Sequence, residues 1–134
     1  MKLTLILGAQ GVILDNYSNN FSAFNIIEEI ASPSFPFLSP PVEWLLVFER
    51  DAQDGQTLTV TLSTELNGEP IHEADRELGF GNKSRLRLRM AMLGMPLSNP
   101  GKLELVVKHG DKILGSYVIQ INSIGKVKTE SDVS

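Results

Sequence analysis

Apolar and polar residues alternate along much of this chain with the period of two that is typical of β-strands. In the clearest run, residues 57–66, the even-numbered positions are apolar except for Thr64, and the odd-numbered positions are Thr, Ser or Glu. Residues 42–49 place Val42, Trp44, Leu46 and Phe48 on one face. Because successive side chains of a strand point to opposite sides, each run predicts a strand with one face in a core.

Less regular runs predict the remaining strands. Residues 3–14 predict a first strand that bends or bulges at Gly8 and Gly11. Residues 21–30 predict a second strand, although Glu28 and Glu29 break the alternation and leave a helix over 24–30 as the alternative. Further strands are expected over 70–78, 85–92, 102–108 and 112–121. Turn-forming residues separate these runs at 15–20, 31–41, 51–56, 67–68, 79–82 and 94–101.

These elements predict the fold class. No segment shows a convincing amphipathic helix, and about eight strands follow one another at intervals of about 8–12 residues. We therefore expect an all-β fold, an antiparallel β-sandwich of immunoglobulin-like type, with a barrel as the alternative. In such an order the Trp44 strand shares a sheet with the last two strands. Residues 1–122 are expected to form a single domain, and the polar tail 123–134 to be disordered.

The last two strands form a hairpin whose loop decides which side chains share a face. A two-residue loop, Gly110-Asp111, would place residues 103, 105 and 107 on the face of the even-numbered residues that follow. A three-residue loop, Lys108-His109-Gly110, would place them with the odd-numbered residues instead. We favour the three-residue loop, because one face then carries the large apolar residues and Tyr117. It predicts Tyr117 buried beside Leu103, with Lys112 and Ser116 facing outward.

Composition limits the functional classes. The 134 residues carry a net charge of −4, which disfavours nucleic acid as a partner. The absence of cysteine excludes disulfides, thiolate nucleophiles and zinc–thiolate sites. No run reaches the ~18 apolar residues of a membrane helix. The apolar start is short and lacks a cleavage site, so it predicts a strand rather than a signal peptide. We expect a cytoplasmic protein without a membrane partner.

Several local features occur together in one known family. They are an N-terminal strand, the Phe35-Pro36 loop, an aromatic strand around Trp44, a strand that ends at Asn67-Gly68, and a final hairpin that begins at Pro100-Gly101. In this succession, over residues 3–122, the chain resembles a family of small bacterial β-sandwich proteins whose function is not established. The resemblance implies the fold and a bacterial cytoplasmic origin, and it carries no activity.

The two histidines are the first candidates for catalysis. The segment His72-Glu73-Ala74-Asp75 could supply a general base or metal ligands, but adjacent residues of a strand point to opposite faces. His109 lies in a turn where only Asp111 could partner it. No serine-nucleophile, phosphate-loop or zinc-helix motif is present. We therefore expect no enzyme activity, no metal site and no cofactor.

The basic strand over 85–92 offers a candidate anion-binding face. Lys83, Arg85, Arg87 and Arg89 recur at every second position, a spacing that could follow phosphates or a carboxylate-rich partner. The alternative is a solvated charge ladder in a hairpin around Gly81. That ladder would pair Glu77 with Arg85, Asp75 with Arg87 and Glu73 with Arg89, and it would point Arg76 inward. We favour the ladder because the protein is acidic overall.

Outward-facing aliphatic residues predict the leading function. If the Trp44 strand and the last hairpin share a sheet, five side chains gather on its outer face: Leu45, Val47, Val106, Leu114 and Val118. They would form an apolar patch on the order of 300 Å², suited to a second copy or a partner subunit. We therefore expect a non-catalytic protein–protein interaction or assembly module. The alternative is a binding module for an anionic ligand or partner that uses the arginine face.

Overall fold

The computed structural model describes residues 1–125, which form strands and no helix. The strands are β1 (Lys2–Asp15), β2 (Asn20–Ile26), β3 (Glu29–Ser32), β4 (Phe37–Leu38), β5 (Val42–Glu49), β6 (Thr57–Leu66), β7 (Glu69–Gly79), β8 (Arg85–Met92), β9 (Pro96–Leu97), β10 (Gly101–His109) and β11 (Lys112–Ser123). The all-β class is confirmed. The expected number of about eight is too low, because the second predicted strand divides into β2 and β3, and two expected loops contain β4 and β9.

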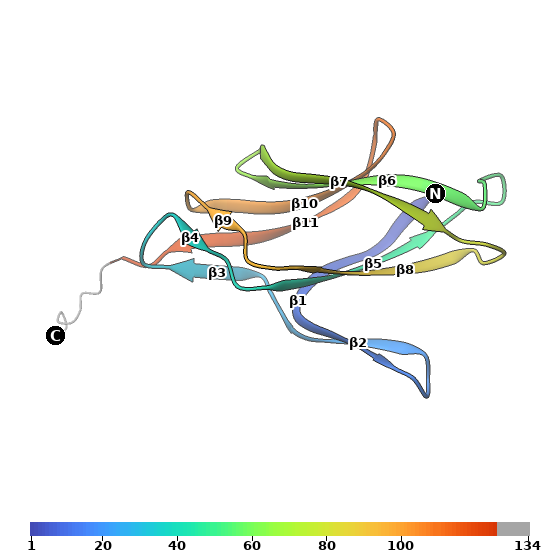
Figure 1. Cartoon of the computed structure of the whole chain (residues 1–134), viewed down its shortest axis with the longest axis horizontal. Helices are drawn as coiled ribbons and strands as arrows, with labels where there is room; N and C mark the ends of the chain where they lie inside the picture. The colour runs from blue at the N-terminus through green and yellow to red at the C-terminus, as the bar shows by residue number, and fades with distance from the viewer. Residues whose placement is uncertain (126–134) are drawn as a thin grey trace.

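Two large sheets lie face to face (Figure 1). The four-stranded sheet has the order β2-β1-β5-β8, and the five-stranded sheet has the order β3-β11-β10-β6-β7. All of their strand pairs are antiparallel except β3 with β11, which run parallel, so a fully antiparallel arrangement is wrong at that edge. One apolar cluster between the sheets contains the predicted faces of β5 and β6, including Trp44, Phe48 and Val60. This layered arrangement is consistent with a β-sandwich.

Trp44 lies in the four-stranded sheet, whereas β10 and β11 belong to the five-stranded sheet. The prediction that they share a sheet is therefore wrong, because β5 pairs with β1 and β8 while the chain crosses to the other layer between β5 and β6. The Trp44 indole is edge-on to the Tyr117 ring, with centroids 5.8 Å apart. The Tyr117 hydroxyl donates to the Ile27 carbonyl at 2.8 Å.

Over residues 101–107 and 115–121 the last hairpin has the predicted faces, but it lacks the predicted loop, and Ile113, which that loop would turn inward, is 61% exposed. His109 pairs with Lys112 across a two-residue turn, with Gly110 at φ +62°. A bulge next to Val107 then shifts the register, so that Leu105 pairs with Tyr117. The bulge restores the parity that a three-residue loop would have given. Tyr117 is consequently half-buried beside Leu105 rather than Leu103, while Lys112 and Ser116 are exposed as expected.

The first strand belongs to two different pairings. Lys2 to Ala9 pair with β5, and Ala9 to Asp15 pair with β2. The change of partner at Ala9 lies between the two glycines at which the sequence predicts a bend. We call residues 10–26, the second half of β1 with β2, the arm. Figure 1 shows the arm extending away from the two layers, below β5 and β8.

At the other end of the chain, β11 continues to Ser123, and the Ile124 amide donates to the Ser32 carbonyl at 3.0 Å. The tail that the sequence predicts to be disordered falls mainly on residues 126–134, which lie outside the described residues. Within residues 1–125 no helix is long and apolar enough to cross a membrane.

Candidate interaction site

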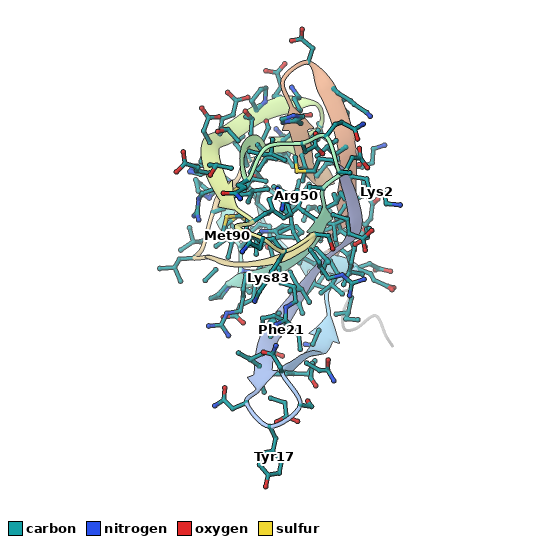
Figure 2. The ribbon with its side chains drawn as sticks, turned by 90° about the vertical axis from the view of Figure 1, so that its right-hand side faces the viewer. Lys2, Tyr17, Phe21, Arg50, Lys83 and Met90 are labelled. Carbon is teal, nitrogen blue, oxygen red and sulfur yellow. The ribbon has the colours of Figure 1, made fainter. Side chains whose placement is uncertain are left out.

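The tip of the arm is a preformed turn. The Asp15 carboxylate accepts the Tyr17 amide at 2.9 Å and the Ser18 hydroxyl at 3.0 Å. Asn19 adopts φ +61°, and its amide donates to the Asp15 carbonyl at 2.7 Å. The amide and hydroxyl donors lower the pKa of the Asp15 carboxyl below its usual value. This turn holds Tyr17 fully exposed at the end of the arm (Figure 2).

The inward face of the arm packs on the outer face of the four-stranded sheet. Ala9, Val12 and Leu45 are buried together, and Phe21 and Ala23 of β2 pack against them. Val12 pairs with Ala23 across the arm, so both strands contribute to this cluster. Apolar burial on this side therefore fixes the arm against the body of the protein.

The opposite side of the arm leaves apolar side chains in solvent. Ile13 is 55% exposed and Phe24 49%, and Ile26, at the base of the arm beside Ala9, is 48% exposed. Phe24 pairs with Gly11, and a Cβ atom at Gly11 would lie only 2.1 Å from its ring. Because Gly11 has no side chain, the Phe24 ring can lie across β1. The sequence predicts a bend or bulge at Gly11, and the structure shows that an aromatic ring approaches the backbone closely there.

Three charged side chains from neighbouring strands also hold the arm. Arg87 of β8 donates to the Asn19 carbonyl at 2.6 Å and to the Asn19 side-chain oxygen at 3.2 Å. Arg89 donates to the Val12 carbonyl at 3.2 Å. Glu43 of β5 accepts the Val12 amide at 2.7 Å. The alternating arginines of β8 therefore have a structural role, because two of them bind backbone carbonyls of the arm.

The predicted charge ladder between β7 and β8 does not form. β7 pairs with β6 and β8 pairs with β5, so the acidic and basic rows lie at the edges of different sheets. Asp75 accepts the Thr61 hydroxyl at 2.8 Å, and Arg85 forms an ion pair with Glu49 at 3.0 Å. The ladder required a hairpin around Gly81 within one sheet. The segment around Gly81 instead connects the two layers.

Part of the basic row lines an open hollow beside the tip of the arm. Its volume is ≈ 780 Å³, and its lining includes Lys83, Arg85 and Arg87 together with Asn19, Phe21, Asn82 and Ser84. Arg89 is not among the lining residues. The structure thus brings together three of the four predicted anion-binding residues. Two of those three already contact groups of the chain itself, as described above.

The predicted five-residue patch does not assemble. Leu45 and Val47 belong to the four-stranded sheet, whereas Val106, Leu114 and Val118 belong to the five-stranded sheet. Leu45, Val47 and Val106 are buried, at 5%, 9% and 7% exposure. Leu114 packs against the core because it lies at the bulge, and only Val118, at 39%, is exposed. The premise of a shared outer face is therefore wrong.

Sequence reasoning missed the exposed side of the arm. The available signal was the segment 20–27, Asn-Phe-Ser-Ala-Phe-Asn-Ile-Ile, which has no charged residue and follows a strong turn. Apolar residues at both odd and even positions of this segment are consistent with burial on one face and exposure of apolar groups on the other. Glu28 and Glu29 break the alternation, which left a helix over 24–30 as the alternative, and the structure forms no helix there.

The histidines lie apart from one another. His72 faces a small hollow of ≈ 260 Å³ between β7 and β8 that Met90 and Met92 also line. His109 has its Nδ1 atom 3.0 Å from the Thr59 carbonyl. Among residues 1–125, no group of three His, Asp or Glu side chains could hold a metal ion.

Comparison with known families and with curated proteins finds no match to the chain. The family resemblance therefore stays a prediction.

Proposed function

We propose that this protein is a non-catalytic protein–protein interaction or assembly module that acts in the cytoplasm, as a homo-oligomer or as an accessory subunit. The observation that carries the proposal is the exposure of apolar side chains on the arm, where Ile13, Phe24 and Ile26 are each about half exposed. Single exposed apolar residues are common on protein surfaces, but a group of them on a projecting element is typical of interaction sites.

The anchoring of the arm supports this role. Arg87, Arg89 and Glu43 bind its backbone or turn, and the cluster around Leu45 packs under it. A surface that is already ordered loses little conformational freedom when a partner binds. The arm can therefore present its apolar side chains at a lower entropic cost than a flexible loop could.

An immunoglobulin-like sandwich is the scaffold that we propose for this module. β4 and β9 form a separate two-stranded sheet, and without it and β2 the large sheets have the orders β1-β5-β8 and β3-β11-β10-β6-β7. These orders match strands A, B and E in one layer and G, F, C and C′ in the other, as in immunoglobulin domains. On this scheme β1 and the parallel β3 share the role of the first strand.

A test of the proposal compares the wild-type protein with Ile13→Lys and with a matched control, Ile113→Lys. Both residues are exposed isoleucines, Ile13 on the arm and Ile113, at 61%, in the last hairpin. We expect the wild type and the control either to self-associate, as measured by light scattering, or to retain one cross-linked partner at constant stoichiometry. We expect Ile13→Lys to lose that association. A wild type with neither property, or an Ile13→Lys protein that behaves like the control, would contradict the proposal.

The hollow beside the arm favours a second candidate function, binding of an anionic ligand. Lys83, Arg85 and Arg87 line it, and Lys83 forms no ion pair with any described residue. The probe is inorganic polyphosphate in calorimetric titrations at low and high salt. Salt-sensitive binding that Lys83→Ala abolishes and Lys112→Ala retains would support this function. Absence of binding at low salt would reject it.

A further inference from the structure

We infer that the partner of the arm is a second copy of this chain, and that the two β2 strands pair antiparallel across a twofold axis. This inference rests on the proposed function and names its partner. The pairing would join the two four-stranded sheets into one continuous sheet, with β2 next to β2 at the centre. The supporting features are the chemistry of the sheet edges, the position of the arm and the exposed area.

The free edge of β2 differs from the other edges of the two large sheets. β8 carries Arg85, Arg87 and Arg89, β3 begins with Glu29, and β7 contains Pro70, a row of carboxylates and Arg76, which is exposed but pairs with the core residue Val60. Charged residues, inward-pointing charges and prolines are features that protect edge strands from pairing with other chains. Residues Asn20–Ile26 of β2 contain no charge and no proline, and the positive φ of Asn25, +53°, limits the regular edge to residues 20–24. That part of the free edge therefore lacks this protection.

Self-pairing suits this strand geometrically. An antiparallel pair of identical strands is related by a twofold axis, so each copy supplies the same donors and acceptors to the other. Figure 2 shows the arm pointing away from the sandwich, with Tyr17 at its far end and Phe21 nearer the body. The free edge of β2 is the one opposite β1, so a second arm would approach the protein from that side.

The exposed area indicates how strong the contact is. Phe24 and Ile26 of β2 are each about half exposed, which corresponds to roughly 100 Å² apiece and about 200 Å² per copy, while Ile13 on β1 lies one strand farther from the partner. A standard interface buries about 800 Å² per partner. The apolar side chains alone are therefore insufficient, and the main-chain hydrogen bonds of the strand edge must contribute. We expect a dimer that forms at high protein concentration and dissociates on dilution.

Sedimentation velocity over a wide concentration range tests the inference on the full-length chain. The variant is Phe24→Lys, which places a charge in the middle of β2, and the matched control is Ile113→Lys, at an exposed site on the five-stranded sheet. Wild type and control should shift from monomer to dimer as concentration rises, whereas Phe24→Lys should remain monomeric. A monomeric wild type at every concentration, or a dimer that Phe24→Lys leaves intact, would overturn the inference.

A spin-label measurement keeps the test independent of any folding defect in that variant. The chain contains no cysteine, so Ser22→Cys gives one labelling site on the exposed face of β2. Antiparallel pairing of residues 20–24, centred near Ser22, places the two Ser22 Cα atoms within about 15 Å. A strong short-range dipolar coupling is expected at Ser22 and not at a Lys112→Cys control. A dimer without that coupling would overturn the pairing.

The outcomes separate the inference from the proposed function. If the wild type is monomeric but retains a different protein through the arm, and Ile13→Lys loses it, the second-copy inference fails and the proposed function stands. If the wild type neither dimerises nor retains a partner, both fail.

Discussion

The guanidinium group of Arg87 lies over the ring of Phe21, 4.7 Å from the ring centroid. Arg87 belongs to β8 and Phe21 to β2, which are the two opposite edges of the four-stranded sheet. The contact is possible because the arm folds across the outer face of the sheet and covers Leu45 of β5. A cation over an aromatic face is attracted by the ring quadrupole, so this contact stabilises the folded-over position.

Replacement of Arg87 by alanine should loosen the arm without unfolding the sandwich. The variant loses the contact with Phe21 and the donors to Asn19, together about 1–2 kcal/mol. Native-state hydrogen exchange should therefore become about tenfold faster for amides of residues 12–23 and stay unchanged in β10. Arg85→Ala is the control, because it removes an exposed ion pair with Glu49. Equal exchange in both variants would show that Arg87 does not hold the arm.

Gly101 should tolerate no side chain. It adopts φ +138°, and a Cβ atom there would lie 1.8 Å from the Asn67 side-chain oxygen. That oxygen accepts a hydrogen bond from the Lys102 backbone amide at 3.0 Å, and the Asn67 side-chain amide donates to the Pro100 carbonyl at 3.0 Å. Gly101→Ala should lower the free energy of unfolding by about 3 kcal/mol through backbone strain and lost hydrogen bonds.

The control for that substitution is Gly79→Ala. No heavy atom lies within 4 Å of a Cβ at Gly79, so we expect a change within about 0.5 kcal/mol. Urea denaturation of both variants provides the comparison. A Gly101→Ala protein as stable as Gly79→Ala would contradict the role assigned to the Asn67 contact.

Tyr117 should make the fold sensitive to alkaline pH. Burial, followed by the charge of Glu28, raises the pKa of its phenol above the usual 10.0. The fold therefore favours the neutral phenol, and the resulting stability is complete below pH 10.0 and lost as pH rises through the raised pKa. The protein has two tyrosines, so phenolate absorbance of Tyr17→Phe reports Tyr117 alone. A midpoint at or below 10.0 would contradict this account.

Tyr117→Phe should remove that part of the alkaline destabilisation. It also removes the hydrogen bond to the Ile27 carbonyl, at a cost of about 1 kcal/mol near neutral pH. Thermal unfolding at neutral and alkaline pH would measure both effects.

Alternation predicted which face of each central strand lies in the core, because burial imposes a period of two on every strand separately. It predicted the inward faces of β5 and β6 and those of the last hairpin. It could not identify strand neighbours. Glu77 and Arg85 are both at odd-numbered positions, as a charge ladder requires, yet they belong to different layers. A short connection can either form a hairpin within one sheet or cross to the other sheet, and alternation does not distinguish the two. Alternation also could not reveal the bulge near Val107, because a two-residue loop with a bulge places the later residues on the same faces as a three-residue loop would.

The candidate site was the least predictable part. The arginines were identified from their spacing, but their partners are the Asn19 and Val12 carbonyls, which carry no side-chain signal in the sequence. Leu45 was predicted to be exposed because it points away from Trp44, and the arm covers it. A strand that folds back over its own sheet depends on long-range contacts that local periodicity does not contain.

Hydrogen exchange of β2 at low and high protein concentration tests the central claim most directly. If the arm is where two copies associate, amides of residues 20–26 should exchange more slowly in concentrated wild-type protein, and those of β7 and β8 should not change. Phe24→Lys should abolish the difference. Exchange of β2 that is independent of concentration, or new protection that appears at β7 and β8 instead, would contradict the assignment of the arm as the site of association.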